Sequence, residues 1–143
     1  MQQYYIEDIY LGMEESIVRV LSNDLVTTFA KITGDINPLH LDDAYAATTI
    51  FKKRVVHGAM LSSLVSAVLG TRLPGYGAIY LSQNTQFLAP VYIDDEVITV
   101  VKVSEVNHQE CKIRFGTECF VGDKKVLTGE ALLVIPRKPF QTS

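Results

Sequence analysis

Apolar and polar residues alternate through the second half of the chain, and this pattern predicts a β-sheet. Four segments share it: residues 78–87, 96–106, 111–121 and 126–135. Turn-forming residues lie between them, at positions 94–95, 107–109 and 122–123. One face of the second segment carries Val97, Thr99, Val101 and Val103, opposite Ile98, Val100 and Lys102. Because short connections join antiparallel neighbours, we expect four antiparallel strands.

The first half predicts one more strand, over residues 15–22, and then a helix over residues 24–32. Ser22 is a candidate N-cap for that helix, and Gly34 is expected to end it. Its predicted apolar stripe consists of Leu25, Phe29 and Ile32.

Pro38 shapes the segment that follows this helix. Proline restricts Asn37 to an extended conformation and is expected to prevent the helix from resuming. Residues 35–41 are therefore predicted to form an ordered loop.

Residues 58–73 are apolar or small on nearly every side, with no charge before Arg72. A helix of this kind must be buried on most of its faces. The economical way to bury both helix and sheet is for the sheet to curl around the helix. The expected fold is α+β, a hot-dog fold in which an antiparallel β-sheet is wrapped around a long central helix.

Neither a Ser/Gly/Pro-rich linker nor an internal repeat interrupts the sequence, so we expect a single domain over residues 1–143. An open antiparallel sheet leaves edge strands, which proteins often protect by pairing them with a second copy. A homodimer with a continuous sheet is therefore expected.

Composition narrows the function classes. Hydrophobic residues make up 48% of the chain and charged residues 20%, values typical of a globular protein. The net charge is −3 and the basic residues are scattered, which argues against a nucleic-acid partner. The sequence shows neither a secretory leader nor an apolar run of about 18 residues, so we expect no membrane partner and a cytoplasmic location.

The two cysteines do not predict a disulfide. Cys111 and Cys119 fall in one predicted strand, where their side chains would face the same side about 26 Å apart. We interpret both as reduced, buried, small apolar residues.

The chemistry-bearing residues concentrate before the central helix. Asp35, Asn37, Pro38 and His40 form an Asp-x-Asn-Pro-x-His run, and His57-Gly58 opens the helix. With Ala46-Ala47-Thr48-Thr49 and Thr128-Gly129-Glu130-Ala131, this combination resembles the R-specific enoyl-CoA hydratases, also called MaoC-like hydratases. The resemblance covers most of the chain from residue 24 to residue 135.

The resemblance implies reversible syn addition of water to a trans-2-enoyl-CoA, giving an (R)-3-hydroxyacyl-CoA, with an acyl-CoA thioester as substrate partner. It assigns Asp35 and His40 to the catalytic water and Gly58 to the oxyanion site. It also matches Ser66, on the central helix, to a family serine that hydrogen-bonds the catalytic aspartate.

These residue types suit hydration, which needs a base for the water proton, a proton donor for C2 and stabilisation of an enolate oxygen. A carboxylate and an imidazole on an irregular loop can converge on one water, and Pro38 limits their drift. The Gly58 N–H, in the first turn of a buried helix, is unpaired and lies at the positive end of the helix dipole.

Each residue also has a structural interpretation. Asn37 either orients the loop or the thioester, or forms an Asx turn ahead of Pro38. Ser66 could bond back to a helix carbonyl. We interpret His57 as structural, shaping the turn at Gly58, and His108 as solvated. Without His40 and the His57-Gly58 pair, we would interpret Asp35 as a turn residue of a surface loop.

No metal or cofactor is expected, because the sequence lacks Cys-x-x-Cys, His-Glu-x-x-His and glycine-rich nucleotide-binding motifs. The cluster Lys52-Lys53-Arg54 is most simply a solvated surface, with phosphate binding to coenzyme A as the alternative. The closed end of the acyl site is expected near Leu69 and residues 132–134.

Three other functions stay open at this stage. They are a 3-hydroxyacyl-ACP dehydratase, a hot-dog acyl-CoA thioesterase and a non-catalytic acyl-CoA-binding module. The Asp35/His40 spacing favours hydration over hydrolysis, and a binding module would give these two residues no reason to coexist.

Overall fold

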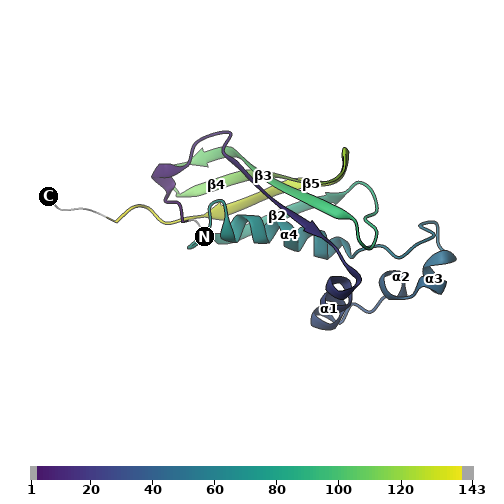
Figure 1. Ribbon diagram of the computed structural model, residues 1–143. Coiled ribbons are helices and arrows are strands. Elements are labelled where there is room, and N and C mark those ends of the chain that lie inside the picture. Colours follow the sequence, from purple (N-terminus) through teal and green to yellow (C-terminus); the bar gives the residue numbers. More distant parts are fainter. Residues whose placement is uncertain (1–2, 140–143) are drawn as a thin grey trace.

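The computed structural model describes residues 3–139. In chain order its elements are η1 (Ile6–Asp8), β1 (Glu14–Val20), α1 (Asn23–Thr33), α2 (Pro38–Leu41), α3 (Asp43–Ala47), α4 (Gly58–Thr71), β2 (Ile79–Phe87), β3 (Glu96–Asn107), β4 (Lys112–Val121) and β5 (Lys124–Val134). The strands form one antiparallel sheet in the order β1-β3-β4-β5-β2. Figure 1 shows α4 lying along this sheet, with α1, α2 and α3 gathered beyond one end. The predicted hot-dog arrangement is confirmed.

β3 and β4 carry the most regular alternation of the chain. Their buried side chains are Val97, Thr99, Val101 and Val103 on β3, and Ile113, Phe115, Thr117 and Cys119 on β4. The apolar members form one core with buried residues of α4, which packs against β1, β3 and β4. The predicted inward and outward faces of β3 are therefore confirmed, as is the turn at residues 122–123.

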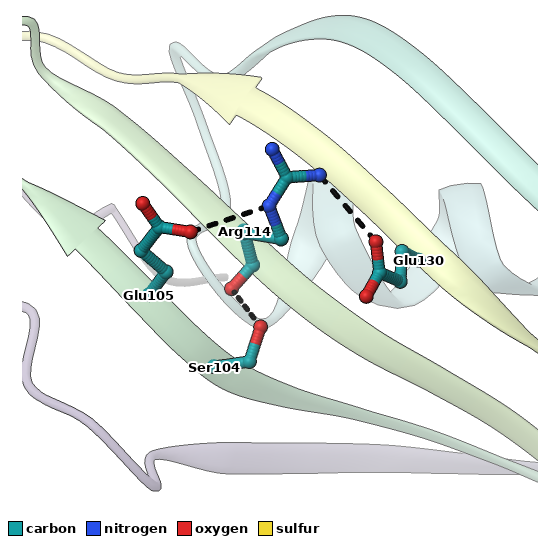
Figure 2. A network of polar contacts seen from close by, with 4 residues as sticks. All are labelled: Ser104, Glu105, Arg114 and Glu130. Atoms are coloured by element: carbon teal, nitrogen blue, oxygen red, sulfur yellow. Dashed lines mark hydrogen bonds and ion pairs between the residues drawn. The ribbon is translucent and has the colours of Figure 1, made fainter.

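The outer face of the sheet is polar. Ser104 is the extra residue of a β-bulge, and its hydroxyl donates to the Arg114 carbonyl oxygen at 3.1 Å. The Arg114 guanidinium lies 3.4 Å from the Glu105 carboxylate and 3.5 Å from the Glu130 carboxylate (Figure 2). All of these side chains reach solvent, so each ion pair contributes about 0–1 kcal/mol.

Gly129 lets β2 approach β5 closely. Gly129 pairs with Thr85, and a Cβ placed on it would collide with the Asn84 backbone. A larger residue here must displace β2, which is an edge strand of the sheet.

The prediction that the central helix is buried on most faces is wrong for the single chain. The side chains that face the core are Met60, Leu61, Val65, Val68 and Leu69. The exposed face consists of small residues: Ala59, Ser63, Ser66, Ala67 and Gly70. The sheet covers only one side of α4. The other side has no charged residues because its side chains are small, and it is not buried in the single chain.

Two predictions in the first half need correction. Val26 and Ala30 are the buried residues of α1, whereas Ile32 is 77% exposed. Residues 35–41 are not wholly a loop, because α2 begins at Pro38. Proline is favoured at the first position of a helix, where its missing N–H costs nothing, so Pro38 starts a new helix instead of preventing one. Ser22 and Gly34 cap α1 as predicted.

Both cysteines are free thiols; Cys119 is buried and Cys111 is half-buried just before β4. Among the described residues, none of the helices has the length and apolar character that a membrane crossing requires.

Candidate active site

α2 presents His40 in a fixed orientation. Asn37 caps this helix, its side-chain oxygen accepting from the Leu39 N–H at 3.1 Å, so the Asx-turn interpretation of Asn37 is the one the structure favours. The His40 Nδ1 lies 2.7 Å from the Val55 carbonyl oxygen. Because a carbonyl only accepts, Nδ1 carries the hydrogen, and Nε2 is the acceptor of the neutral ring.

Arg54 ties the segment around His40 to α1. Its Nε donates to the His40 carbonyl oxygen at 2.8 Å, and its Nη2 donates to the Asn23 side-chain oxygen at 2.7 Å. These bonds restrain the His40 backbone, and the contact with the Val55 carbonyl restrains the His40 ring. The Arg54 guanidinium therefore links α2 to the start of α1.

His57 is the N-cap residue of α4 and its side chain is only 1% exposed. Its ring stacks on His40 with centroids 3.8 Å apart and planes 25° from parallel. Its Nε2 lies 3.0 Å from the Asp35 carbonyl oxygen. The structural interpretation of His57 did not foresee these contacts. The His57 ring contacts both members of the predicted catalytic pair.

The side chains of Asp35 and His40 converge as predicted. One carboxylate oxygen of Asp35, one ring nitrogen of His40 and one of His57 lie within 4.8 Å of one another. A single water can hydrogen-bond two groups at this separation, since each bond spans about 2.8 Å. The Asp35 side chain is exposed, and its Oδ1 accepts from the Asn37 N–H at 3.4 Å.

The same three side chains are close enough to be considered as metal ligands. Lone pairs of imidazole nitrogens lie in the ring plane, however, and the two rings are stacked. Stacked rings direct their lone pairs side by side rather than toward one ion at about 2.0–2.1 Å. The arrangement suits proton transfer better than metal binding.

Burial lowers the pKa of His40 below its ordinary value. The Val55 carbonyl opposes this shift, nearby His57 adds to it, and the Asp35 carboxylate opposes it. The lowered pKa keeps His40 neutral at physiological pH, so its Nε2 is available as a base.

A cavity of about 380 Å³ lies beside His40 and Gly58. Its other lining residues are Phe51, Val55, Val56, Leu61, Phe87, Leu88, Ala89, Pro90 and Val91. Gly58 is the first residue of α4, and a Cβ there would lie 3.0–3.2 Å from the Phe87 ring. The absence of a Cβ at Gly58 therefore leaves room beside the Phe87 ring, at a helix start where the first N–H groups have no partner within the helix.

The expected closed end of the acyl site near Leu69 and residues 132–134 does not line this cavity. Leu69 and Leu133 are buried in the core instead. The apolar residues that do line the cavity include Leu88 and Val91, which follow β2.

Ser66 is not brought to Asp35. It lies on the exposed face of α4 and lines a separate hollow of about 390 Å³ with residues 80–83. Within the part of the chain that the structure describes, no hydrogen bond joins Ser66 to Asp35. The alternative, a bond back to a helix carbonyl, is seen for Ser63, whose hydroxyl donates to the Met60 carbonyl at 2.6 Å.

A basic hollow of about 360 Å³ is lined mainly by residues next in sequence to those of the cavity, in the segments 51–56 and 87–93. It is lined by Asp43, Lys52, Lys53, Arg54, Tyr92 and Ile93. The Lys53 ammonium lies 4.5 Å from the centre of the Tyr92 ring. Val55, which lines the apolar cavity, forms an antiparallel bridge with Tyr92, which lines the basic hollow.

Comparisons with known proteins find similar sequences and a similar fold. The family model described as "MaoC like domain" matches residues 12–128. A "3-hydroxybutyryl-CoA dehydratase" of Methylorubrum extorquens is 47% identical over 134 residues, covering 94% of this chain and 85% of that protein. An "(R)-specific enoyl-CoA hydratase" of Rhodospirillum rubrum is 42% identical and covers 94% of each chain. The solved structure of "R-Hydratase PhaJ1 from Pseudomonas aeruginosa" superposes with a TM-score of 0.91 at 33% identity, covering 99% of this chain and 98% of that one.

Proposed function

The chain belongs to the MaoC-like domain family, and we propose that it is an (R)-specific enoyl-CoA hydratase. As a hydro-lyase of this kind it adds water reversibly to a trans-2-enoyl-CoA and forms an (R)-3-hydroxyacyl-CoA. The names of its relatives support this reaction class. The observation that carries the proposal is the convergence of Asp35 and His40 beside the cavity that Gly58 lines.

In this reaction the water is held between the Asp35 carboxylate and His40 Nε2. As the water oxygen bonds to C3, its proton passes to the Asp35–His40 pair and the π electrons of the C2–C3 bond form an enolate. The Gly58 N–H hydrogen-bonds the thioester oxygen, an interaction worth about 2.7–4 kcal/mol in comparable enzymes. The pair then protonates C2 on the face from which the water came, so the addition is syn.

We assign coenzyme A as the carrier of the acyl group. The cavity is mostly apolar, as an acyl chain requires, and the adjoining hollow presents Lys52 and Lys53. Within residues 3–139 no ion pair joins either lysine to a carboxylate, and the Lys53 ammonium lies over the Tyr92 ring. Unpaired cations beside the cavity suit the phosphates of coenzyme A.

A homodimer is part of the proposal. β2 is an edge strand whose exposed apolar side chains include Ile79, Leu81 and Phe87, at 59%, 47% and 53% exposure. The adjacent face of α4 carries only small residues, which allow close approach of a second copy. Pairing of two β2 edges would cover this face and place Ser66 at the interface. Sedimentation as a particle of two chains is the expected result, and a monomer at micromolar concentration would contradict it.

We further propose that residues 1–143 act as one catalytic domain in cytoplasmic fatty-acid metabolism. Acyl-CoA thioesters are intermediates of that metabolism, and free thiols such as Cys111 and Cys119 are typical of a reducing compartment.

The decisive experiment mixes purified protein with crotonyl-CoA and follows the ultraviolet absorbance of the conjugated thioester, with a thiol assay in parallel. Loss of absorbance without thiol release, giving (R)-3-hydroxybutyryl-CoA on chiral analysis, is the expected result. Release of thiol would instead identify a thioesterase.

Two further outcomes separate the remaining alternatives. Turnover of crotonyl-ACP in place of crotonyl-CoA would identify a carrier-protein dehydratase. Tight binding of crotonyl-CoA with no turnover would identify a binding module. Either result overturns the hydratase proposal.

A further inference from the structure

His57 is the most enclosed polar side chain of the site, yet the chemistry described so far leaves it unused. Its ring packs between His40, at 3.8 Å, and Phe29, whose centroid lies 4.9 Å away. Its Nε2 contacts the Asp35 backbone at 3.0 Å. One side chain therefore contacts both residues of the catalytic pair and directly precedes Gly58.

The hydrogen bonds fix the protonation of the His57 ring. The Asp35 carbonyl only accepts, so Nε2 of His57 carries the hydrogen. Nδ1 of His57 is buried and has no hydrogen-bond partner within residues 3–139. The neutral His57 ring is thus the Nε2–H tautomer, with Nδ1 as an acceptor that has no donor.

His40 is held in the opposite tautomer, because its Nδ1 donates to the Val55 carbonyl. Two backbone carbonyls therefore select different tautomers for the two stacked rings. The acceptor nitrogen of His40 belongs to a ring that lines the cavity, while the acceptor nitrogen of His57 is sealed in the protein. Only one of the two imidazoles can take the water proton.

A buried nitrogen without a partner needs an explanation, since an apolar residue would fill the same space without that unsatisfied group. Contact with both Asp35 and His40 supplies one. We propose that His57 is a positioning residue: its Nε2–H fixes the Asp35 backbone and its ring face fixes the plane of His40, so that both catalytic groups stay aimed at one water. This inference rests on the proposed hydratase function.

A substrate-free measurement tests the geometry. Long-range proton–nitrogen NMR spectra report the tautomer of each imidazole, and the chain has only three histidines. The exposed His108 is assigned by its loss in the variant His108→Gln. We expect an Nε2–H signal for neutral His57 and an Nδ1–H signal for neutral His40. An Nδ1–H tautomer for neutral His57 overturns the inference.

Variants separate the two contacts of His57. His57→Phe keeps a flat ring against His40 but loses the donor to Asp35. His57→Gln keeps a donor but loses the ring, and His57→Leu loses both. The first two are expected to lower kcat for crotonyl-CoA by about 10- to 100-fold with little change in KM, and His57→Leu by more than either, as small misplacements of catalytic groups do.

Phe115→Leu is the matched control, because Phe115 is a buried aromatic residue of β4 outside the site. It should lower the melting temperature and leave kcat unchanged. If folded His57→Phe and His57→Gln keep the wild-type kcat, or lose it only as their stability falls, the inference is overturned. If the variants do not fold, the wild-type tautomers decide. A wild-type protein that hydrates no enoyl thioester overturns the proposed function, whereas wrong tautomers overturn this inference alone.

Discussion

The sheet core and the segment between α1 and α4 are built on different physical principles. β3, β4 and β5 bury alternate side chains in one continuous apolar core. Residues 34–57 bury few, namely Ala46, Val55, Val56 and His57. This segment is ordered mainly by helix caps and by the polar contacts that His40, Arg54 and His57 make with backbone and side-chain oxygens.

We therefore expect stability and catalytic geometry to be separable in this chain. Removal of a large core side chain should reduce the free energy of unfolding and leave the site's geometry intact. Removal of a catalytic side chain from the polar segment should abolish turnover and leave the fold intact.

The largest effect is expected from Asp35→Asn and His40→Gln. Each removes one of the two groups that hold the water, so kcat for crotonyl-CoA should fall by about 10²–10⁴-fold. Asp35 is exposed and His40 is half-buried, so the melting temperature should stay near that of the wild type. Initial rates and thermal unfolding followed by circular dichroism provide the measurements.

Two exposed residues serve as matched controls for these variants. Asp123→Asn, in the turn between β4 and β5, and His108→Gln make the same chemical changes outside the site. Both should retain wild-type turnover. Near-normal turnover in either Asp35→Asn or His40→Gln would refute the assigned roles.

Phe115→Ala tests whether the sheet core can be weakened without loss of catalysis. Phe115 is fully buried on β4, and truncation of such a residue costs about 3–5 kcal/mol of stability. Urea denaturation should show this loss, while kcat per folded molecule stays unchanged at a temperature where the variant is folded. A folded Phe115→Ala that has lost turnover would show that core packing and site geometry are coupled.

The sheet could be predicted from the sequence because its signal is local and periodic. The alternation around Val101 predicts a strand, and the turn residues at Gly122 predict a tight connection between two strands. The family prediction, made from the Asp35–His40 run and His57-Gly58, was confirmed by the comparisons. Convergence of Asp35 and His40 was also predicted correctly, because Pro38 constrains the short chain between them.

Features set by contacts distant in sequence could not be predicted. The stack of His57 on His40 and the bond from Arg54 to Asn23 join residues 17 and 31 positions apart. His-Gly before an apolar helix was the available signal for His57, but periodicity does not report where a single ring points. Exposure of one face of α4 was missed for a related reason, since small residues suit both a core and an interface between chains.

The pH profile of the reaction tests whether His40 is the base. If His40 is the base, kcat/KM requires its neutral form and should fall about tenfold per pH unit on the acid side. Burial lowers the pKa of His40, so the midpoint should lie below the ordinary value of 6.5, with a plateau through neutral pH. This acid limb should be absent from the residual activity of His40→Gln. A midpoint above 6.5 would show that another group acts as the base.

The smallest effect is expected at the basic hollow, where charge assists binding without touching the reacting atoms. Reversal of both charges in Lys52→Glu/Lys53→Glu should raise KM for crotonyl-CoA by about three- to tenfold at low salt, and less at high salt because exposed charges are screened. KM for crotonyl-pantetheine, which lacks the nucleotide phosphates, should not change. Lys102→Glu/Lys124→Glu, at two exposed lysines on β3 and β5, makes the same change in net charge away from the hollow. An equal rise in KM for both thioesters would mean that the lysines act on the shape of the cavity, and no rise for either would place the phosphates elsewhere on the protein.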